Sequence, residues 1–272
     1  MASKRPLKDF WIRTASALAI GAAFLTAIFF GGPLGLAVVC AVVGALSAVE
    51  LFALLRREHR LPNEVFGIAA VVAMPFAAAT HGLAGLGAAF GALIVVSLAW
   101  HLAFPQVKAS DTAATVFGAA YVGFSLAHLV LIRQLDAGTE LVLATVASVW
   151  ANDSFAYLVG STFGRHKMAP SISPRKSWEG FAAGTLFTTA VWVIVGTVSD
   201  VGLPVGAMAA VGLAASFAAV LGDLAESRLK READVKDSGR LLPGHGGFLD
   251  RFDSMIVVSV VAYYALIAVG AR

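Results

Sequence analysis

The chain has 272 residues and a formal net charge of +3, with 58% apolar residues, 14% charged residues and a mean hydropathy of +0.81. Soluble globular proteins contain about 45–50% apolar and about 25% charged residues, so this composition excludes a water-soluble domain. Because Cys40 is the single cysteine, a disulfide or a cysteine zinc site within one chain is excluded as well.

Nine apolar stretches follow one another along the chain, and each is close to the roughly 20 residues that a helix needs to cross a bilayer core. A spanning segment must satisfy its own backbone hydrogen bonds, and the chain lacks the alternating pattern of barrel strands. The sequence therefore predicts an all-α polytopic membrane protein. The amino-terminal stretch is interpreted as the first span and not as a signal peptide, because another span follows almost at once. The predicted spans are residues 11–30, 33–55, 65–81, 83–104, 112–132, 141–159, 178–198, 201–221 and 255–271.

Charge placement predicts the orientation of these spans. With the amino terminus in the cytoplasm, all Lys and Arg residues except Arg133 and Arg272 lie on the cytoplasmic side, which is a strong form of the positive-inside bias. The sequence therefore predicts an integral protein of the plasma membrane whose active site faces the cytoplasm. Residues 1–140 are expected to supply scaffold helices, and residues 141–272 the helices that carry the catalytic loops, within a single membrane domain.

Polar side chains inside two predicted spans need an explanation. Asn152 and Asp153 sit in the sixth span, roughly 10 Å below its cytoplasmic end, where an ionisable residue is expected to line a cavity. They are predicted to contact a polar substrate, with a structural contact between helices as the alternative. Glu50 lies in the second span near Arg56, and this position leaves both a functional and a structural role open.

The longest polar segments are residues 160–177 and 222–254, both on the predicted cytoplasmic side. Four cations of the first segment reflect topology and attraction to anionic lipid, or they bind phosphate. These are Arg165, Lys167, Arg175 and Lys176.

The second segment combines carboxylates, cations and glycines. If the eighth helix continues a few turns past its span, Asp223, Ser227 and Lys230 lie near one face, because they are spaced at i, i+4 and i+7. Helix-breaking glycines follow and let backbone amides approach an anion, and Asp250 and Asp253 then begin the last span. Carboxylate oxygens suit Mg²⁺, which keeps waters and substrate phosphates in its shell. The segment therefore predicts phosphoryl or nucleotidyl transfer at a membrane surface.

Residues 227–253 resemble the complete signature of the phosphatidate cytidylyltransferases, also called CDP-diacylglycerol synthases. The stretches "NDSFAYLVGSTFGRHKMAPSISPRKSWEG" and "GDLAES" are also similar to blocks of that family, so the resemblance covers residues 150–253. The signature positions are filled by Ser227, Leu229, Lys230, Arg231, Lys236, Asp237, Gly239, Leu242, Pro243, His245, Gly246, Gly247, Phe248, Asp250, Arg251, Phe252 and Asp253.

The resemblance implies a reaction in which CTP and phosphatidic acid give CDP-diacylglycerol and pyrophosphate, with Mg²⁺ required. Together with the residue pattern, it predicts Asp223, Lys230, Asp250 and Arg251 as catalytic residues. The predicted Mg²⁺ ligands are Asp223, Asp250 and Asp253. The residues expected to bind substrate are Asn152, Asp153, Arg175, Lys176, Ser227, Arg231, Lys236, Asp237, His245, Gly246 and Gly247.

The expected partners are CTP, phosphatidic acid and the lipid bilayer, without nucleic acid, and a homodimer is left open. A CTP-dependent lipid kinase or a cytidylyltransferase for isoprenoid-ether phosphatidate is an alternative with closely related chemistry. A transporter is a more distant alternative, because it would usually show repeated halves with broken helices near the midplane. The sequence shows no such repeat.

Overall fold

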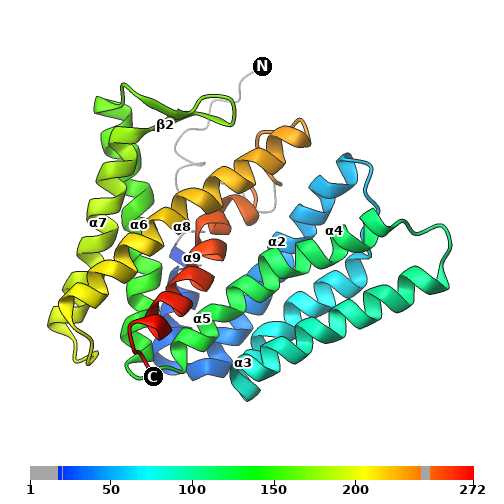
Figure 1. Ribbon diagram of the computed structural model, residues 1–272, viewed down its shortest axis with the longest axis horizontal. Helices are drawn as coiled ribbons and strands as arrows, with labels where there is room; N and C mark the ends of the chain where they lie inside the picture. The colour runs from blue at the N-terminus through cyan, green and yellow to red at the C-terminus, as the bar shows by residue number, and fades with distance from the viewer. Residues whose placement is uncertain (1–17, 20, 240–245) are drawn as a thin grey trace.

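The computed structural model describes residues 18–19, 21–239 and 246–272, which form a helical protein with one small β-hairpin (Figure 1). The helix Gly21–Phe30 comes first. The later helices are α2 (Gly32–Arg57), α3 (Glu64–Ala103), α4 (Ala109–Ala119), the π-helix η1 (Ala120–Phe124), α5 (Ser125–Arg133), α6 (Gly138–Phe163), α7 (Trp178–Val198), α8 (Val205–Glu232) and α9 (Leu249–Ala268). The strands are β1 (Lys167–Ala169) and β2 (Ser173–Ser177).

The helices confirm the predicted membrane class. In the described part of the chain, seven helical segments are long and apolar enough to cross a membrane, and α4, η1 and α5 together form one of them. The predicted span 178–198 coincides with α7. The predicted first span, 11–30, begins outside the described residues, and its described part includes the helix Gly21–Phe30. The number of nine spans therefore stays a prediction.

Helix α3 is folded back on itself at Gly82, so it contains two of the predicted spans. Gly82 has φ +61° and ψ −149°, a conformation that glycine adopts at far lower cost than other residues. The rings of Phe66 and Trp100 have centroids 5.5 Å apart, whereas a straight helix would separate these residues by roughly 50 Å. Figure 1 shows the two arms lying side by side in cyan and teal. The predicted spans 65–81 and 83–104 correspond to these arms.

The amino-terminal half packs around small residues. The ring of Phe52 is fully buried between Gly67 and Gly118, and a Cβ at either glycine would overlap the ring. Gly123, in η1, lies against the backbone of Val71, where an added Cβ would be 2.6 Å from the Val71 Cα atom. Such contacts let membrane helices approach closely, since lipid provides no hydrophobic driving force between them.

The carboxyl-terminal half packs in chain order, with α6 on α7, α7 on α8 and α8 on α9. Figure 1 shows α8, in yellow to orange, running obliquely across its neighbours. The α6–α7 contact is close at Gly180, where an added Cβ would lie 2.7 Å from the Ala156 carbonyl oxygen. Helix α9 also contacts α2 and α5, so it joins the two halves of the protein.

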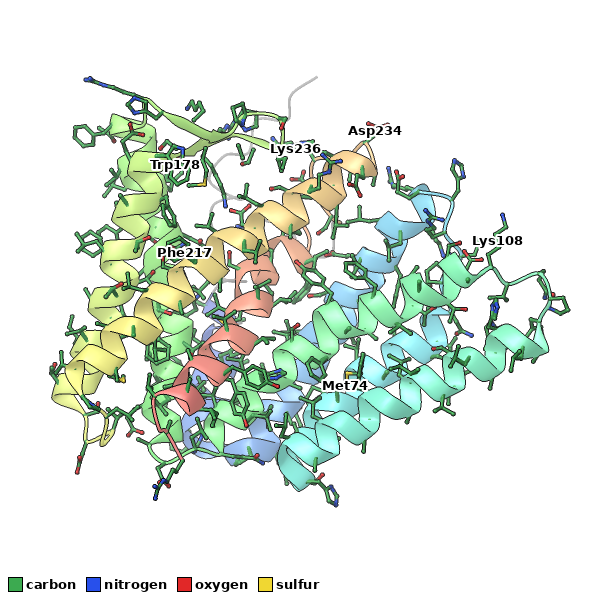
Figure 2. All side chains as sticks on the ribbon, viewed as in Figure 1. Met74, Lys108, Trp178, Phe217, Asp234 and Lys236 are labelled. Carbon is green, nitrogen blue, oxygen red and sulfur yellow. The ribbon has the colours of Figure 1, made fainter. Side chains whose placement is uncertain are left out.

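The connections between helices gather at two opposite ends (Figure 1). One end carries the turn between the two arms of α3, the α5–α6 and α7–α8 connections and the carboxyl terminus. The other end carries the β-hairpin and the last turn of α8, and Figure 2 places Trp178, Asp234 and Lys236 along it. The two groups of connections match the two groups of loops that the charge pattern placed on opposite sides of the membrane. Which end faces the cytoplasm remains a prediction from the charges.

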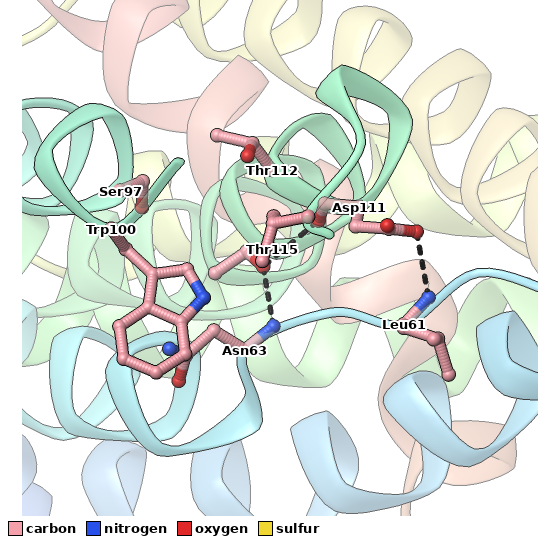
Figure 3. Close-up of a pocket in the computed structure, with 8 residues that line it drawn as sticks. Leu61, Asn63, Ser97, Trp100, Asp111, Thr112 and Thr115 are labelled. Carbon is pink, nitrogen blue, oxygen red and sulfur yellow. Dashed lines mark hydrogen bonds between the residues drawn. The ribbon is translucent and has the colours of Figure 1, made fainter. Parts of the chain in front are cut away.

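The connection between α2 and α3 is fixed to α4 by two hydrogen bonds (Figure 3). The Leu61 amide donates to Asp111 Oδ1 at 2.9 Å, and the Asn63 amide donates to Thr115 Oγ1 at 2.7 Å. The cavity beside these bonds has a volume of about 10 Å³, which is no more than a single water requires. This small cavity is therefore a packing feature and too small for a substrate.

Candidate active site

A cavity of about 580 Å³ opens between α6, α7, α8 and the β-hairpin. Its volume lies within the range of roughly 300–1,000 Å³ that is usual for small-molecule sites. The charged and amide groups that line it include five of the residues predicted to bind substrate or metal. These are Asn152, Asp153, Arg175, Lys176 and Asp223.

The β-hairpin was not predicted, because residues 160–177 were identified only as a polar segment. Strands β1 and β2 are antiparallel, with Lys167 opposite Ser177. The hairpin is fastened to the first turn of α7 by Glu179, whose carboxylate accepts from the backbone amides of Arg165 and His166 and from His166 Nδ1 at 2.6 Å. The side chains of β2 are thereby held in a fixed direction relative to α7.

Strand β2 brings Lys176 to Asp223 of α8. Lys176 Nζ lies 2.7 Å from Asp223 Oδ2, and the Ser227 hydroxyl donates to Asp223 Oδ1 at 3.2 Å. Because α8 continues to Glu232, the predicted sharing of one helix face by Asp223 and Ser227 is confirmed. Both oxygens of Asp223 thus have a donor, and its carboxylate is held at the wall of the cavity.

Three aspartates from three different helices lie in the same region beside the cavity, and we call them the aspartate trio: Asp153 of α6, Asp223 of α8 and Asp253 of α9. Each lies within electrostatic range of the other two. Lys176 and Arg251 lie close enough to Asp153 to offset part of this negative charge. The approach of α9 to α8 depends on Gly222, because a Cβ there would lie 2.5 Å from the Asp253 carbonyl oxygen.

Asn152 lies behind the trio and is 3% exposed. Its Nδ2 atom donates to Asp153 Oδ1 at 3.4 Å, whereas its buried Oδ1 atom has no hydrogen-bond partner among the described residues. Gly184 of α7 leaves room for that oxygen, since a Cβ there would be 2.7 Å from it. Asn152 therefore takes part in a helix contact as well as lining the cavity.

A second group of charges surrounds Lys230, and it holds Asp250 apart from the trio. Lys230 Nζ lies 2.6 Å from Asp250 Oδ1 and is in ion-pair contact with Glu226, whose side chain is fully buried. Asp250 also accepts from the backbone amides of Ser238, at 3.0 Å, and Gly247, at 2.9 Å. Lys230 and Asp250 thus connect the end of α8, the residues after it and the start of α9.

The remaining predicted residues surround these two groups. Arg231 donates to the Val235 carbonyl oxygen at 3.0 Å, and the side chains of Lys236, Asp237 and Arg251 are exposed at the same end. Gly246 has φ +86°, and a Cβ there would lie 3.1 Å from Asp250 Oδ2. The predicted residue His245 lies outside the described residues.

Two residues of the amino-terminal half reach this region, and the sequence did not assign them to it. Glu50 accepts hydrogen bonds from Ser238 and Leu249. Tyr121, in η1, lies within electrostatic range of Asp223, Glu226 and Asp253, and its buried hydroxyl has no hydrogen-bond partner among the described residues. The carboxylate of Glu50 inside a predicted span was the available signal for the first residue, whereas the approach of Tyr121 depends on long-range packing.

Whether these carboxylates fit Mg²⁺ depends on their grouping and on the donors that they already have. Among the described residues, no group of three or more His, Cys, Asp or Glu side chains is arranged closely enough to hold a metal ion. The neighbouring carboxylates of Asp223 and Asp253 nevertheless fit Mg²⁺, which usually takes one or two carboxylates and completes its shell with waters and substrate phosphates. The oxygens of Asp250 already accept from Lys230 and two backbone amides, and those of Asp223 accept from Lys176 and Ser227, so a metal ion would have to displace a donor at either residue.

Comparison with known proteins gives a match over nearly the whole chain. The model of the Cytidylyltransferase family matches residues 11–269. A phosphatidate cytidylyltransferase of Mycobacterium bovis is 34% identical over 269 residues, covering 92% of this chain and 85% of the relative. One from Staphylococcus aureus is 34% identical over 218 residues, covering 80% and 76%, and one from Bacillus subtilis is 42% identical over 149 residues, covering 54% and 55%.

Proposed function

Because this chain belongs to the cytidylyltransferase family, we propose that it transfers CMP from CTP to phosphatidic acid, giving CDP-diacylglycerol and pyrophosphate. The observation that carries this proposal is the 580 Å³ cavity at one end of the membrane helices, lined by both carboxylates and cations. The names of the relatives support the same substrates. A nucleotide supplies the CMP group, and a membrane lipid supplies the accepting phosphate.

The reaction needs no nucleophile from the protein. An oxygen of the lipid phosphate attacks the α-phosphorus of CTP, a new phosphorus–oxygen bond forms, and the bond to the β-phosphate breaks to release pyrophosphate. Both reactants are anions that repel each other, so catalysis consists mainly of aligning them and offsetting their charge. Lys176 and Arg175 reach the cavity from β2 and are suited to hold phosphate oxygens.

Beside the phosphate-binding cations, the aspartate trio supplies carboxylates that can bind a metal ion. Mg²⁺ bound to Asp223 and Asp253 would shield the phosphates of CTP and stabilise negative charge on the departing pyrophosphate. Asp153 lies on the α6 side of the cavity, and we assign it and Asn152 to substrate contacts. Lys230 and Asp250, joined by their 2.6 Å ion pair, keep the start of α9 and therefore Asp253 in place.

We further propose that the cavity faces the cytoplasm from the plasma membrane. The cations of the β-hairpin and of the α8 end lie at the end of the helices that also carries the cavity. The positive-inside bias places such an end in the cytoplasm, where CTP is available. A lipid enters the same region from the bilayer, so both substrates can meet without leaving their own phase.

The test uses purified protein in detergent with Mg²⁺, phosphatidic acid and CTP labelled at either the α- or the γ-phosphate. We expect α-label to appear in a CDP-lipid and γ-label to appear in pyrophosphate, both only when phosphatidic acid is present. Appearance of γ-label in the lipid would identify a lipid kinase and refute the proposal. Preference for an isoprenoid-ether phosphatidate over diacyl phosphatidate would change the assigned lipid but keep the reaction.

A further inference from the structure

Glu50 is a buried carboxylate that the reaction itself does not use. It lies in α2, is 3% exposed and belongs to the amino-terminal half. Its Oε2 atom accepts from the Ser238 hydroxyl at 3.0 Å and from the Leu249 backbone amide at 2.9 Å. In the sequence, Ser238 precedes residues 240–245 and Leu249 follows them. Leu249 is the first residue of α9.

An ion pair with the nearby Arg56 does not explain the buried carboxylate of Glu50. The sequence places Arg56 near Glu50, but the Nε atom of Arg56 lies 2.6 Å from Glu64 Oε1. The free backbone amides at the start of a helix attract a negative charge, and a buried carboxylate needs such donors to offset its desolvation. Glu50 therefore acts on Ser238, six residues after α8 ends, and on the start of α9, far from its own place in the sequence.

Two glycines confirm that the surrounding backbone is fitted to this carboxylate. A Cβ at Gly239 would overlap Glu50 Oε1, and a Cβ at Gly247 would overlap Glu50 Oε2 and the Ser238 hydroxyl. Neither glycine has a φ in the left-handed region, so space and not backbone conformation requires glycine there. The sequence had explained Gly247 by access to a phosphate, and the structure adds a separate reason.

Ser238 connects Glu50 to the charged groups of the site. Its hydroxyl donates to Glu50, and its backbone amide donates to Asp250 at 3.0 Å. Asp250 in turn accepts from the Gly247 amide and pairs with Lys230. The short backbone stretches at Ser238 and Gly247 are thus held between two carboxylates, one from α2 and one from α9.

We propose that Glu50 is a positioning residue: it holds Ser238 and the start of α9 so that Asp250 and Lys230 keep the arrangement that the reaction needs. Glu50 does not touch the 580 Å³ cavity, so it acts through these other residues. This inference rests on the proposed cytidylyltransferase function for its kinetic readout. It also assigns an indirect, positioning role in that function to the amino-terminal half.

The first test compares Glu50→Gln, Ser238→Ala and the double variant. Each single change should lower kcat/KM for CTP by roughly 10- to 100-fold, as expected for loss of one or two hydrogen bonds to a charged group. We expect both a lower kcat and a higher KM for CTP in protein with an unchanged detergent melting temperature. Since the two residues share one hydrogen bond, the double variant should lose less than the product of the single losses. Glu64→Gln is the matched control, because it removes a carboxylate outside the site.

A second readout does not depend on activity. Hydrogen–deuterium exchange should become faster at the amides of Ser238, Gly247 and Leu249 in Glu50→Gln, while the amides around Glu64 stay unchanged. Wild-type protein without CTP-dependent turnover would refute the proposed function but leave this exchange result to decide the positioning role. Unchanged exchange together with wild-type KM for CTP in Glu50→Gln would refute the positioning role alone.

A size exchange separates hydrogen bonding from packing. Gly239→Ala places a methyl group where the Glu50 carboxylate lies, so it should lower kcat/KM at least tenfold. Combining it with Glu50→Ala relieves the overlap but does not restore the hydrogen bonds. We expect this double variant to regain thermal stability and to stay at least tenfold less active. Full recovery of kcat/KM would show that Glu50 only fills space and would overturn the inference.

Discussion

Lys230→Met is the substitution whose cost the structure defines best. Lys230 is 13% exposed and pairs with Glu226 and Asp250, whose side chains are 0% and 9% exposed. Methionine replaces most of the apolar part of the side chain but leaves two carboxylates without this cation. Removing one partner from a buried ion pair costs about 3–5 kcal/mol. For a chain of this size the melting temperature falls by roughly 2–4 °C per kcal/mol, so we expect a loss on the order of 10 °C.

The second step adds Glu226→Gln to Lys230→Met, which removes one of the two uncompensated charges. We expect the double variant to recover at least half of the lost melting temperature, measured by detergent-solubilised thermal denaturation at fixed lipid and Mg²⁺. Turnover should stay low if Lys230 also holds a substrate phosphate. A single variant that melts within 2 °C of wild type would refute the reasoning about buried charge, as would a double variant that melts no higher than the single one.

Three further predictions concern the metal, the hairpin and the topology. Asp223→Asn should keep the fold but abolish turnover and the Mg²⁺ dependence of CTP binding by calorimetry; near-normal turnover at limiting Mg²⁺ would exclude this ligand. Lys176→Met should lower kcat/KM at least tenfold, because charge-assisted phosphate contacts contribute about 1.5–3 kcal/mol, whereas the exposed control Arg57→Met should change it less than twofold. In a chain whose one cysteine is replaced by alanine, Thr80→Cys should react with an impermeant thiol reagent in intact cells and Ser171→Cys should not; the opposite pattern would reverse the predicted orientation.

The sequence predicted the helices well where hydropathy and charge determine them. Helix α7 ends where predicted, and the extension of α8 beyond residue 221 followed from the spacing of Asp223 and Ser227. The interruption of the predicted span 112–132 by η1 was not predicted, because a π-turn changes the backbone without changing hydropathy. The small hairpin was also missed, since two short strands have little pattern of their own.

The sequence named candidate site residues, but it did not indicate how the structure groups them. Asp223 and Asp250 were expected together as metal ligands, but Asp223 joins the aspartate trio whereas Asp250 pairs with Lys230. That pairing joins residues from two helices, and nothing in local spacing specifies it. The contact of Glu50 with Leu249 spans 199 positions. This contact forms only because α9 packs against α2 and α8.

The long separation between Glu50 and Leu249 also sets an order for biosynthesis. Glu50 enters the membrane with α2, whereas its two donors, Ser238 and Leu249, are translated 188 and 199 residues later. Chains made from the amino terminus form their early contacts first, so α2 must wait with an uncompensated carboxylate while six more helices are inserted. A chain that has not yet inserted α9 therefore lacks the Glu50 contacts, and we expect it to be inactive.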